Sequence, residues 1–400
     1  MNCRPPLVAP ANDVSSTEAG IMMVKAGMPG AVATAIALVL CGALPLSAQD
    51  STGTQPGDVP ISLDDGDALG GGSSAGLAVT GFGVAGYQYD ARTSENSFGA
   101  GKLAVGLFRE LGDYTYAYGQ LTTAVSDDGE TETEIDNLIL STSIPGASSV
   151  SIMLGKLDLP IGFERDDEPL QFLASPSYNF EFARPVKLVG VMGAWSATPQ
   201  LRLAGFLFNG WDDEGESNHG KTVGARAGFL PAPTLSLGVS GLYGAEGDPG
   251  ATHNRFLLDA DYAWQPSWDW ILAGEANWGG DREIQDDGSD ATWSGAMLTL
   301  LHQFTTHVGV AARAEVFKDT DGARTGVPQT LTSYSLAPLF SMGVGRDGMF
   351  ANVEHTTFRI PRLQLRLEAR LNHSTVPVFE TSDGVSQWGT ELRASAVTTF

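Results

Sequence analysis

Two sets of charged side chains could act on ions and small polar solutes, because fixed charges along a water-filled passage attract or repel what passes them. The first set is a run of four acids around one base in the connection 161–185: Glu164, Arg165, Asp166, Asp167 and Glu168. The second set lies in stretches where polar and apolar residues alternate: Arg226, Arg313, Glu315, Arg366, Glu368, Arg370 and Arg393. If the chain encloses a water-filled lumen, we expect the first set to form its constriction and the second to line its wall. The alternatives are a solvated outer loop and salt bridges that brace a wall.

The alternation is clearest in residues 362–372, where every even-numbered residue is polar and every odd-numbered one is apolar. Side chains on a β-strand point alternately to opposite faces, so this pattern predicts a strand with one wet face and one apolar face. A stretch of about 9–11 residues is long enough for a tilted strand to cross a bilayer. Sixteen such stretches follow one another: 75–90, 96–111, 114–126, 132–144, 150–159, 186–197, 201–211, 221–230, 235–245, 254–264, 268–279, 291–304, 307–318, 330–342, 362–373 and 388–400.

The connections between these stretches alternate between short turns and long loops, as in a barrel with turns at one rim and loops at the other. The sequence therefore predicts an all-β fold, a transmembrane antiparallel β-barrel of sixteen strands, with fourteen or eighteen strands as alternatives. The segment 341–361 breaks the alternation because it contains a further strand-like stretch, Met349 to Phe358. We expect an extended turn or hairpin there, on the periplasmic side.

The cost of placing charge in lipid decides which face of each strand is wet. An Arg or Lys on the lipid face at mid-membrane costs about 2–4 kcal/mol. The face with Arg366 and Glu368 is therefore expected to face water, and the face with Leu365 and Leu367 to face lipid. Two interfacial aromatic belts are expected from tryptophans at strand ends. Their members are Trp264, Trp268 and Trp270 at a short turn and Trp211, Trp278 and Trp293 beside long loops.

The N-terminal part of the chain has the pattern of a secretory signal peptide, which we assign to residues 1–48. A positive residue precedes the apolar stretch Ala31–Leu44, and small residues follow it. The sequence ahead of Met22 lacks this pattern, so we expect translation to start near that residue. Residues 49–74 are rich in Asp, Gly, Ser and Pro and predict a disordered, acidic periplasmic tail. Residues 75–400 form the predicted barrel.

Composition excludes several classes of protein. The net charge of −24 argues against a nucleic-acid partner, which would need clustered Lys and Arg. Both cysteines, Cys3 and Cys41, fall in the predicted signal peptide, which leaves a mature chain without thiols, as suits the oxidising cell envelope. The six histidines form no catalytic or metal-binding motif. We therefore expect no enzyme activity, no cofactor and no metal site.

Four stretches taken in succession resemble a known family: Gly155–Gly162, Ala174–Tyr178, Asn209–Asp213 and Arg366–Ser374. Their order and residues are similar to those of the β-barrel porin-2 family of outer-membrane porins, over most of residues 75–400. The resemblance implies a passive pore, either a monomer or a homotrimer. It carries over no catalytic residue.

The sequence predicts a porin in the outer membrane of a Gram-negative bacterium. Its predicted function is the passive diffusion of small hydrophilic solutes or ions. A structural or adhesive barrel without a conducting pore is the alternative. The acid run is net negative, so we expect weak cation selectivity if this loop folds inward. The expected partners are outer-membrane lipid, lipopolysaccharide, the transported solutes and the barrel-assembly machinery, which would bind the last strand ending at Phe400.

Overall fold

The computed structural model describes most of the predicted barrel region and none of the predicted signal peptide and tail. These two N-terminal predictions, residues 1–48 and 49–74, therefore lie outside the described residues. The described ranges are 77–99, 101–125, 130–212, 214–216, 218–247, 252–285, 287–343, 347–350 and 353–400. Among them, no helix is long and apolar enough to cross a membrane.

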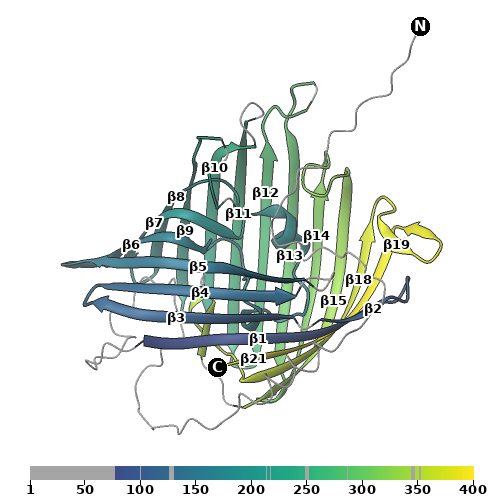
Figure 1. The fold of residues 1–400 in the computed structure, drawn as a ribbon, viewed down its shortest axis with the longest axis horizontal. Helices are drawn as coiled ribbons and strands as arrows, with labels where there is room; N and C mark the ends of the chain where they lie inside the picture. Colours follow the sequence, from purple (N-terminus) through teal and green to yellow (C-terminus); the bar gives the residue numbers. More distant parts are fainter. Residues whose placement is uncertain are drawn as a thin grey trace.

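Within the described residues, sixteen strands form one closed antiparallel barrel, shown in Figure 1. Successive strands pair with each other, and β1 pairs with β21 from Phe82 opposite Thr399 to Asp90 opposite Glu391, which closes the ring. The prediction of sixteen strands is confirmed. The strands are β1 (Leu77–Asp90), β3 (Lys102–Gly112), β4 (Thr115–Val125), β5 (Thr131–Ile144), β6 (Ala147–Asp158), β7 (Lys187–Thr198), β8 (Leu201–Phe208), β9 (Thr222–Ala232), β10 (Leu235–Glu246), β11 (His253–Ser267), β12 (Trp270–Asp281), β13 (Ala291–Gln303), β14 (Val308–Asp319), β15 (Gln329–Met342), β18 (Leu363–Ser374) and β21 (Trp388–Thr399).

In the described part of the chain, five short strands accompany the barrel. The strand β2 (Asn96–Gly99) precedes β3. Both β2 and β3 pair with β1, along different parts of it, so they occupy the same place in the ring of strands. The strands β16 (Asp347–Phe350) and β17 (Val353–Arg359) pair only with each other among the described strands, and they lie in the segment for which the sequence predicted an extended turn or hairpin. A second small hairpin, β19 (Phe379–Thr381) with β20 (Gly384–Ser386), lies between β18 and β21.

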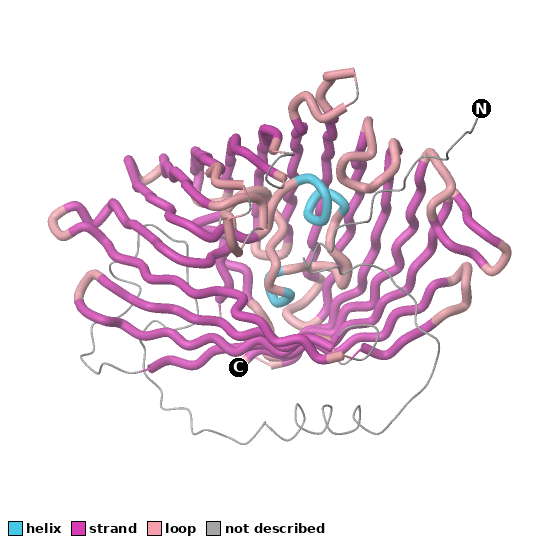
Figure 2. Tube along the Cα trace, turned by 45° about the horizontal axis from the view of Figure 1, so that its top comes forward, coloured by secondary structure: helices cyan, strands magenta, loops and turns pink. Residues whose placement is uncertain are grey.

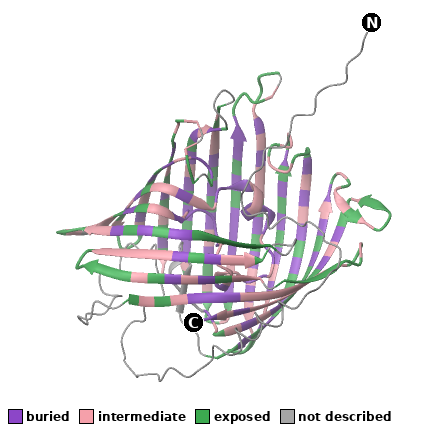
Figure 3. Ribbon diagram, viewed as in Figure 1, coloured by how far each residue is buried: buried purple, intermediate pink, exposed green. Residues whose placement is uncertain are grey.

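The strand faces follow the alternation read from the sequence. On β18, Leu367 and Leu371 are exposed on the outer surface, whereas Arg366, Glu368 and Arg370 between them are buried inside the barrel. The regular alternation of buried and exposed residues along the strands is visible in Figure 3. The outer, apolar face is thus available to lipid, as predicted.

The inside of the barrel also contains apolar clusters, which the sequence analysis did not predict. On β6, Ile152 and Leu154 are exposed on the outer surface, and Met153 and Leu157 are buried on the inner face. The latter two belong to a cluster that includes residues of the connection between β6 and β7. Because that connection enters the barrel, the inner wall can bury apolar side chains as a soluble core does.

The structure contradicts the predicted aromatic belts for two of the six tryptophans. Trp264, Trp268, Trp270 and Trp278 are exposed, whereas Trp211 and Trp293 are buried inside the barrel. The two buried rings pack edge to face with their centroids 5.9 Å apart. They lie close to the loops in sequence, as expected of belt residues, but their side chains turn inward and pack against the internal loop described next.

Candidate functional site

The connection between β6 and β7, residues 159–186, lies inside the barrel, as Figure 2 shows. It contains two short helical turns, η1 (Glu168–Leu170) and η2 (Asn179–Ala183). Its residues contact side chains of β3, β4 and β7 on one part of the wall and of β11 to β14 and β18 on another. This inner loop therefore crosses the lumen.

Gly162 is the first point at which the inner loop is fixed to the far wall. Its N–H donates to Asp259 Oδ1 on β11 at 3.1 Å, and the N–H of Phe163 donates to Glu275 Oε2 on β12 at 2.7 Å. Gly162 has φ +71, and a Cβ at this position would lie 2.4 Å from Glu275 Oε2 and 2.6 Å from Arg184 Nε. Only glycine fits both this backbone conformation and this close approach.

Side chains of β18 hold the middle of the inner loop. Glu368 accepts hydrogen bonds from the N–H groups of Ala174 and Ser175, both at 2.8 Å, and Arg366 donates to the carbonyl of Glu168 at 2.8 Å. Buried backbone groups need such partners. Because the loop covers this face, Arg366 is only 1% exposed. The prediction that Arg366 and Glu368 face water is therefore wrong, although their strand face is the predicted one.

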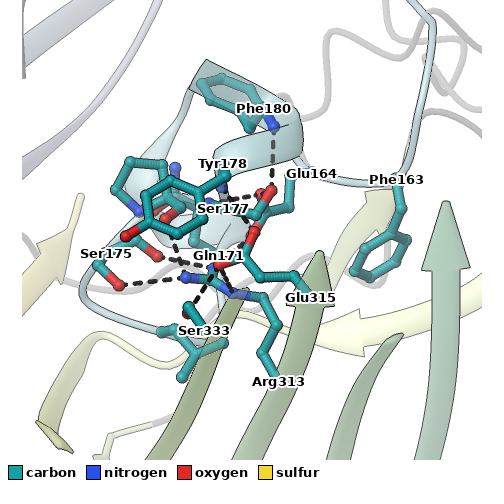
Figure 4. Close-up of polar contacts among 12 residues, drawn as sticks. Phe163, Glu164, Gln171, Ser175, Ser177, Tyr178, Phe180, Arg313, Glu315 and Ser333 are labelled. Carbon is teal, nitrogen blue, oxygen red and sulfur yellow. Dashed lines mark hydrogen bonds and ion pairs between the residues drawn. The ribbon is translucent and has the colours of Figure 1, made fainter. Parts of the chain in front are cut away.

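Arg313 on β14 binds the same part of the loop through both ends of its guanidinium group (Figure 4). Nη1 donates to Glu164 Oε1 at 2.7 Å and to the carbonyl of Ser175 at 2.9 Å, and Nη2 donates to the carbonyl of Pro176 at 2.8 Å. The side chain of Arg313 is completely buried. Its charge is thus used to hold the loop rather than exposed to water.

Glu315 and Arg370 extend this network to the next residues of the loop. Glu315 Oε2 accepts the N–H of Tyr178 at 2.6 Å, while its Oε1 accepts Arg370 Nη2 at 3.1 Å and the hydroxyl of Ser333 at 2.9 Å. Arg370 also donates to the carbonyl of Pro176 at 3.0 Å and lies 4.5 Å from the centroid of the Tyr178 ring. Figure 4 shows Arg313, Glu315, Tyr178 and Ser333 converging at this point.

The returning part of the inner loop is fixed by Trp293 on β13 and by Arg324 in the connection between β14 and β15. The indole nitrogen of Trp293 donates to the carbonyl of Ala183 at 3.0 Å, and Arg324 Nε donates to the carbonyl of Phe182 at 2.6 Å. Sequence analysis placed Trp293 in an aromatic belt and missed Arg324. Arg324 lies outside any alternating strand, so no periodic signal marked it.

The acids at the start of the loop face two lysines that sequence analysis also missed. Asp166 Oδ2 lies 3.1 Å from Lys187 Nζ and 4.0 Å from Lys102 Nζ, and Glu168 Oε2 lies 3.6 Å from Lys102 Nζ. Each lysine is the first residue of a strand after a connection. Lys102 shares the inner face of β3 with the buried Ala104, so the alternation could have revealed it.

Burial and neighbouring charge move the pKa values of Asp166 and Asp167 in opposite directions. Burial opposes ionisation of Asp166, but Lys187 and Lys102 hold its pKa at about 2. For Asp167, burial dominates and raises the pKa to about 7. The contact that the structure shows for its carboxylate is a 3.1 Å hydrogen bond from the amide of Gln120.

The remaining predicted site residues are paired with near neighbours. Arg165 donates to the carbonyl of Gly162 at 3.3 Å within its own loop, and burial lowers its pKa to about 10. Arg226 forms a two-pronged ion pair with Asp261, at 2.6 and 2.9 Å. Arg393 Nη2 lies 2.7 Å from Glu391 Oε2 on the same strand.

A closed antiparallel barrel with a loop folded into its lumen is the architecture of outer-membrane channels. The model of the family described as "Putative beta-barrel porin-2, OmpL-like" matches residues 102–400, and the chain belongs to this family. It is an outer-membrane porin, and its family and fold indicate a channel rather than an enzyme. A comparison with curated proteins found no match.

Several solved porins have a similar fold. The outer membrane channel DcaP of Acinetobacter baumannii has a TM-score of 0.59 and 10% identity, covering 81% of this chain and 97% of that chain. The anion-selective porin of Comamonas acidovorans has a TM-score of 0.56 and 11% identity, with coverages of 81% and 99%. The trimer form of OmpT from Vibrio cholerae has a TM-score of 0.54 and 10% identity, also with coverages of 81% and 99%. At these identities the likeness shows the fold alone.

Proposed function

We propose that this porin lets small hydrophilic solutes and ions diffuse passively past the inner loop, which acts as the constriction and gives the pore a weak preference for cations. The observation that supports this most directly is the solvent access of the acids near the lysines. The side chains of Asp158, Asp166 and Glu168 remain 30%, 24% and 25% exposed. By contrast, those of Arg313 and Arg370 are 0% and 3% exposed.

Passive diffusion is supported by the way in which the loop is held. Wall carboxylates accept its N–H groups and wall arginines donate to its carbonyls, as Glu368 and Arg313 do. Breaking such buried, charge-assisted hydrogen bonds is expensive. The loop is therefore a fixed narrowing. Solutes can diffuse past it without a ligand or an energy source that moves the loop.

A structural or adhesive barrel without a conducting pore remains the second candidate, because one specific observation favours it. Apolar side chains such as Phe163, Phe172 and Leu173 of the loop pack with the inner wall and fill part of the lumen. To block the passage of ions, this packing would have to extend across the whole cross-section of the lumen. The partial exposure of Asp158 and Asp166 supports an open path beside the lysines.

We also infer the surroundings of the protein from its class. OmpT of Vibrio cholerae is described in a trimer form, and a homotrimer is the assembly we propose here. Lipopolysaccharide would contact the extracellular half of the outer face. The barrel-assembly machinery would bind β21, which is followed by the exposed aromatic Phe400.

Single-channel recording in planar bilayers tests the proposed function. The purified, folded protein is expected to give discrete and stable conductance steps, and liposome swelling is expected to show uptake of small neutral sugars. Folded protein that inserts into the bilayer but carries no current would support the closed barrel instead.

A further inference from the structure

The inner loop divides the charged residues of the lumen into two groups with different roles. On the side of β14 and β18, the charged side chains of the wall bind the inner loop itself. Arg313 binds the carbonyls of Ser175 and Pro176, and Arg366 binds that of Glu168. Arg313 and Arg366 are buried and bonded to the loop, so a passing ion cannot contact them.

Toward β3 to β7, the charges are arranged around Lys187 instead. Its Nζ lies 2.5 Å from Asp158 Oδ1, 2.7 Å from Asp136 Oδ1 and 3.1 Å from Asp166 Oδ2. These carboxylates come from β6, β5 and the inner loop, so a single ammonium group joins three separate parts of the chain. Lys102 provides a second ammonium group near Asp166 and Glu168.

The charges in this second group do not balance. Two lysines face the five carboxyl groups of Asp136, Asp158, Asp166, Asp167 and Glu168. Lys187 and Lys102 are 13% and 17% exposed, so both still contact solvent. Each lysine therefore cancels a charge that a passing ion would otherwise meet.

We propose that Lys187 determines how selective the pore is, by neutralising carboxylates at the solvent-exposed side of the constriction. Lys102 does the same to a smaller extent, because its two ion pairs are longer. This assignment rests on the proposed function. It adds two wall lysines to the acid run of the inner loop, from which the sequence predicted the selectivity.

Lys187→Gln tests this assignment, with reversal potentials measured in a potassium chloride gradient at pH 8. Removing one unit charge close to the ion path is expected to raise the cation-to-anion permeability ratio by at least about twofold. A unit charge roughly 4 Å away in water changes the local concentration of a monovalent ion by about fivefold, and salt screening weakens this effect. Lys187→Arg is expected to keep the wild-type ratio. Lys221→Gln is the matched control, because Lys221 pairs with Glu216 in an extracellular loop.

An unchanged ratio in folded Lys187→Gln channels would overturn the assignment. Should that variant fail to fold, Lys102→Gln decides the question, and it is expected to shift the ratio in the same direction by a smaller factor. A shift equal to that of Lys221→Gln would also overturn it. Wild-type protein without any current would instead overturn the proposed function itself, and the assignment with it.

Discussion

Glu164 Oε1 lies 2.7 Å from Arg313 Nη1, an ion pair that joins the inner loop to β14 across 149 positions of sequence. Arg313 is completely buried and Glu164 nearly so. The pair therefore cannot respond to solutes as exposed charges do. It fixes the loop against the wall and leaves selectivity to the residues on the other side.

Arg313→Gln is predicted to loosen the inner loop. Removing one partner of a buried pair leaves an uncompensated charge and typically costs about 3–5 kcal/mol. We expect noisy, fluctuating currents and a lower thermal unfolding temperature. Arg282→Gln is the control, since Arg282 pairs with Asp290 in an exposed loop. Quiet wild-type currents in the Arg313 variant would show that other contacts suffice to hold the loop.

Gly162→Ala is predicted to displace the start of the inner loop. Its left-handed backbone costs a non-glycine residue about 1–2 kcal/mol, and the added Cβ would collide with Glu275. We expect an altered and less uniform single-channel conductance. Gly193→Ala is the matched control, because a Cβ there meets nothing within 4 Å. Identical conductance in the two variants would contradict the predicted collision.

Thiol labelling can separate the covered part of the inner wall from the part in contact with water. Ser333 is 0% exposed beneath the loop, whereas the side chain of Arg393 is 18% exposed. A membrane-impermeant reagent should therefore label Arg393→Cys and leave Ser333→Cys unmodified until the protein is unfolded. Rapid labelling of native Ser333→Cys would mean that the loop does not cover β15.

Selectivity is predicted to depend on pH through two carboxyl groups of the inner loop. Burial raises the pKa of both Asp167 and Glu181 to about 7, so each is neutral below that pH and negative above it. Asp166, with its pKa held at about 2, stays ionised throughout. Cation preference should rise between pH 6 and pH 8, as measured by reversal potential. The double variant Asp167→Asn/Glu181→Gln should lack this rise, and a rise that persists in it would assign the titration elsewhere.

The barrel could be predicted because each strand carries its own period-2 pattern, as in residues 362–372. Lipid imposes this pattern on every strand separately, so no knowledge of distant contacts was needed. The same pattern placed Arg313 and Arg366 on the inner face correctly.

The partners of these residues could not be predicted, because they depend on contacts between distant parts of the chain. Nothing in the spacing of Arg366 shows that Glu168, 198 positions away, supplies its acceptor. In the sequence, Lys187 is an ordinary residue at the start of a strand. Only the structure shows that Asp136, Asp158 and Asp166 surround it. The alternation predicts the face of the barrel to which a side chain points. It does not predict whether that side chain contacts water or is covered by a loop.

The central claim is that the acids of the inner loop give a conducting pore its cation preference. The most direct measurement is the reversal potential of wild-type channels in a salt gradient at pH 8, beside the triple variant Asp166→Asn/Asp167→Asn/Glu168→Gln. We predict weak cation selectivity in the wild type and its loss in the triple variant. Anion preference in the wild type, or a triple variant that is as cation-selective as the wild type, would contradict the claim.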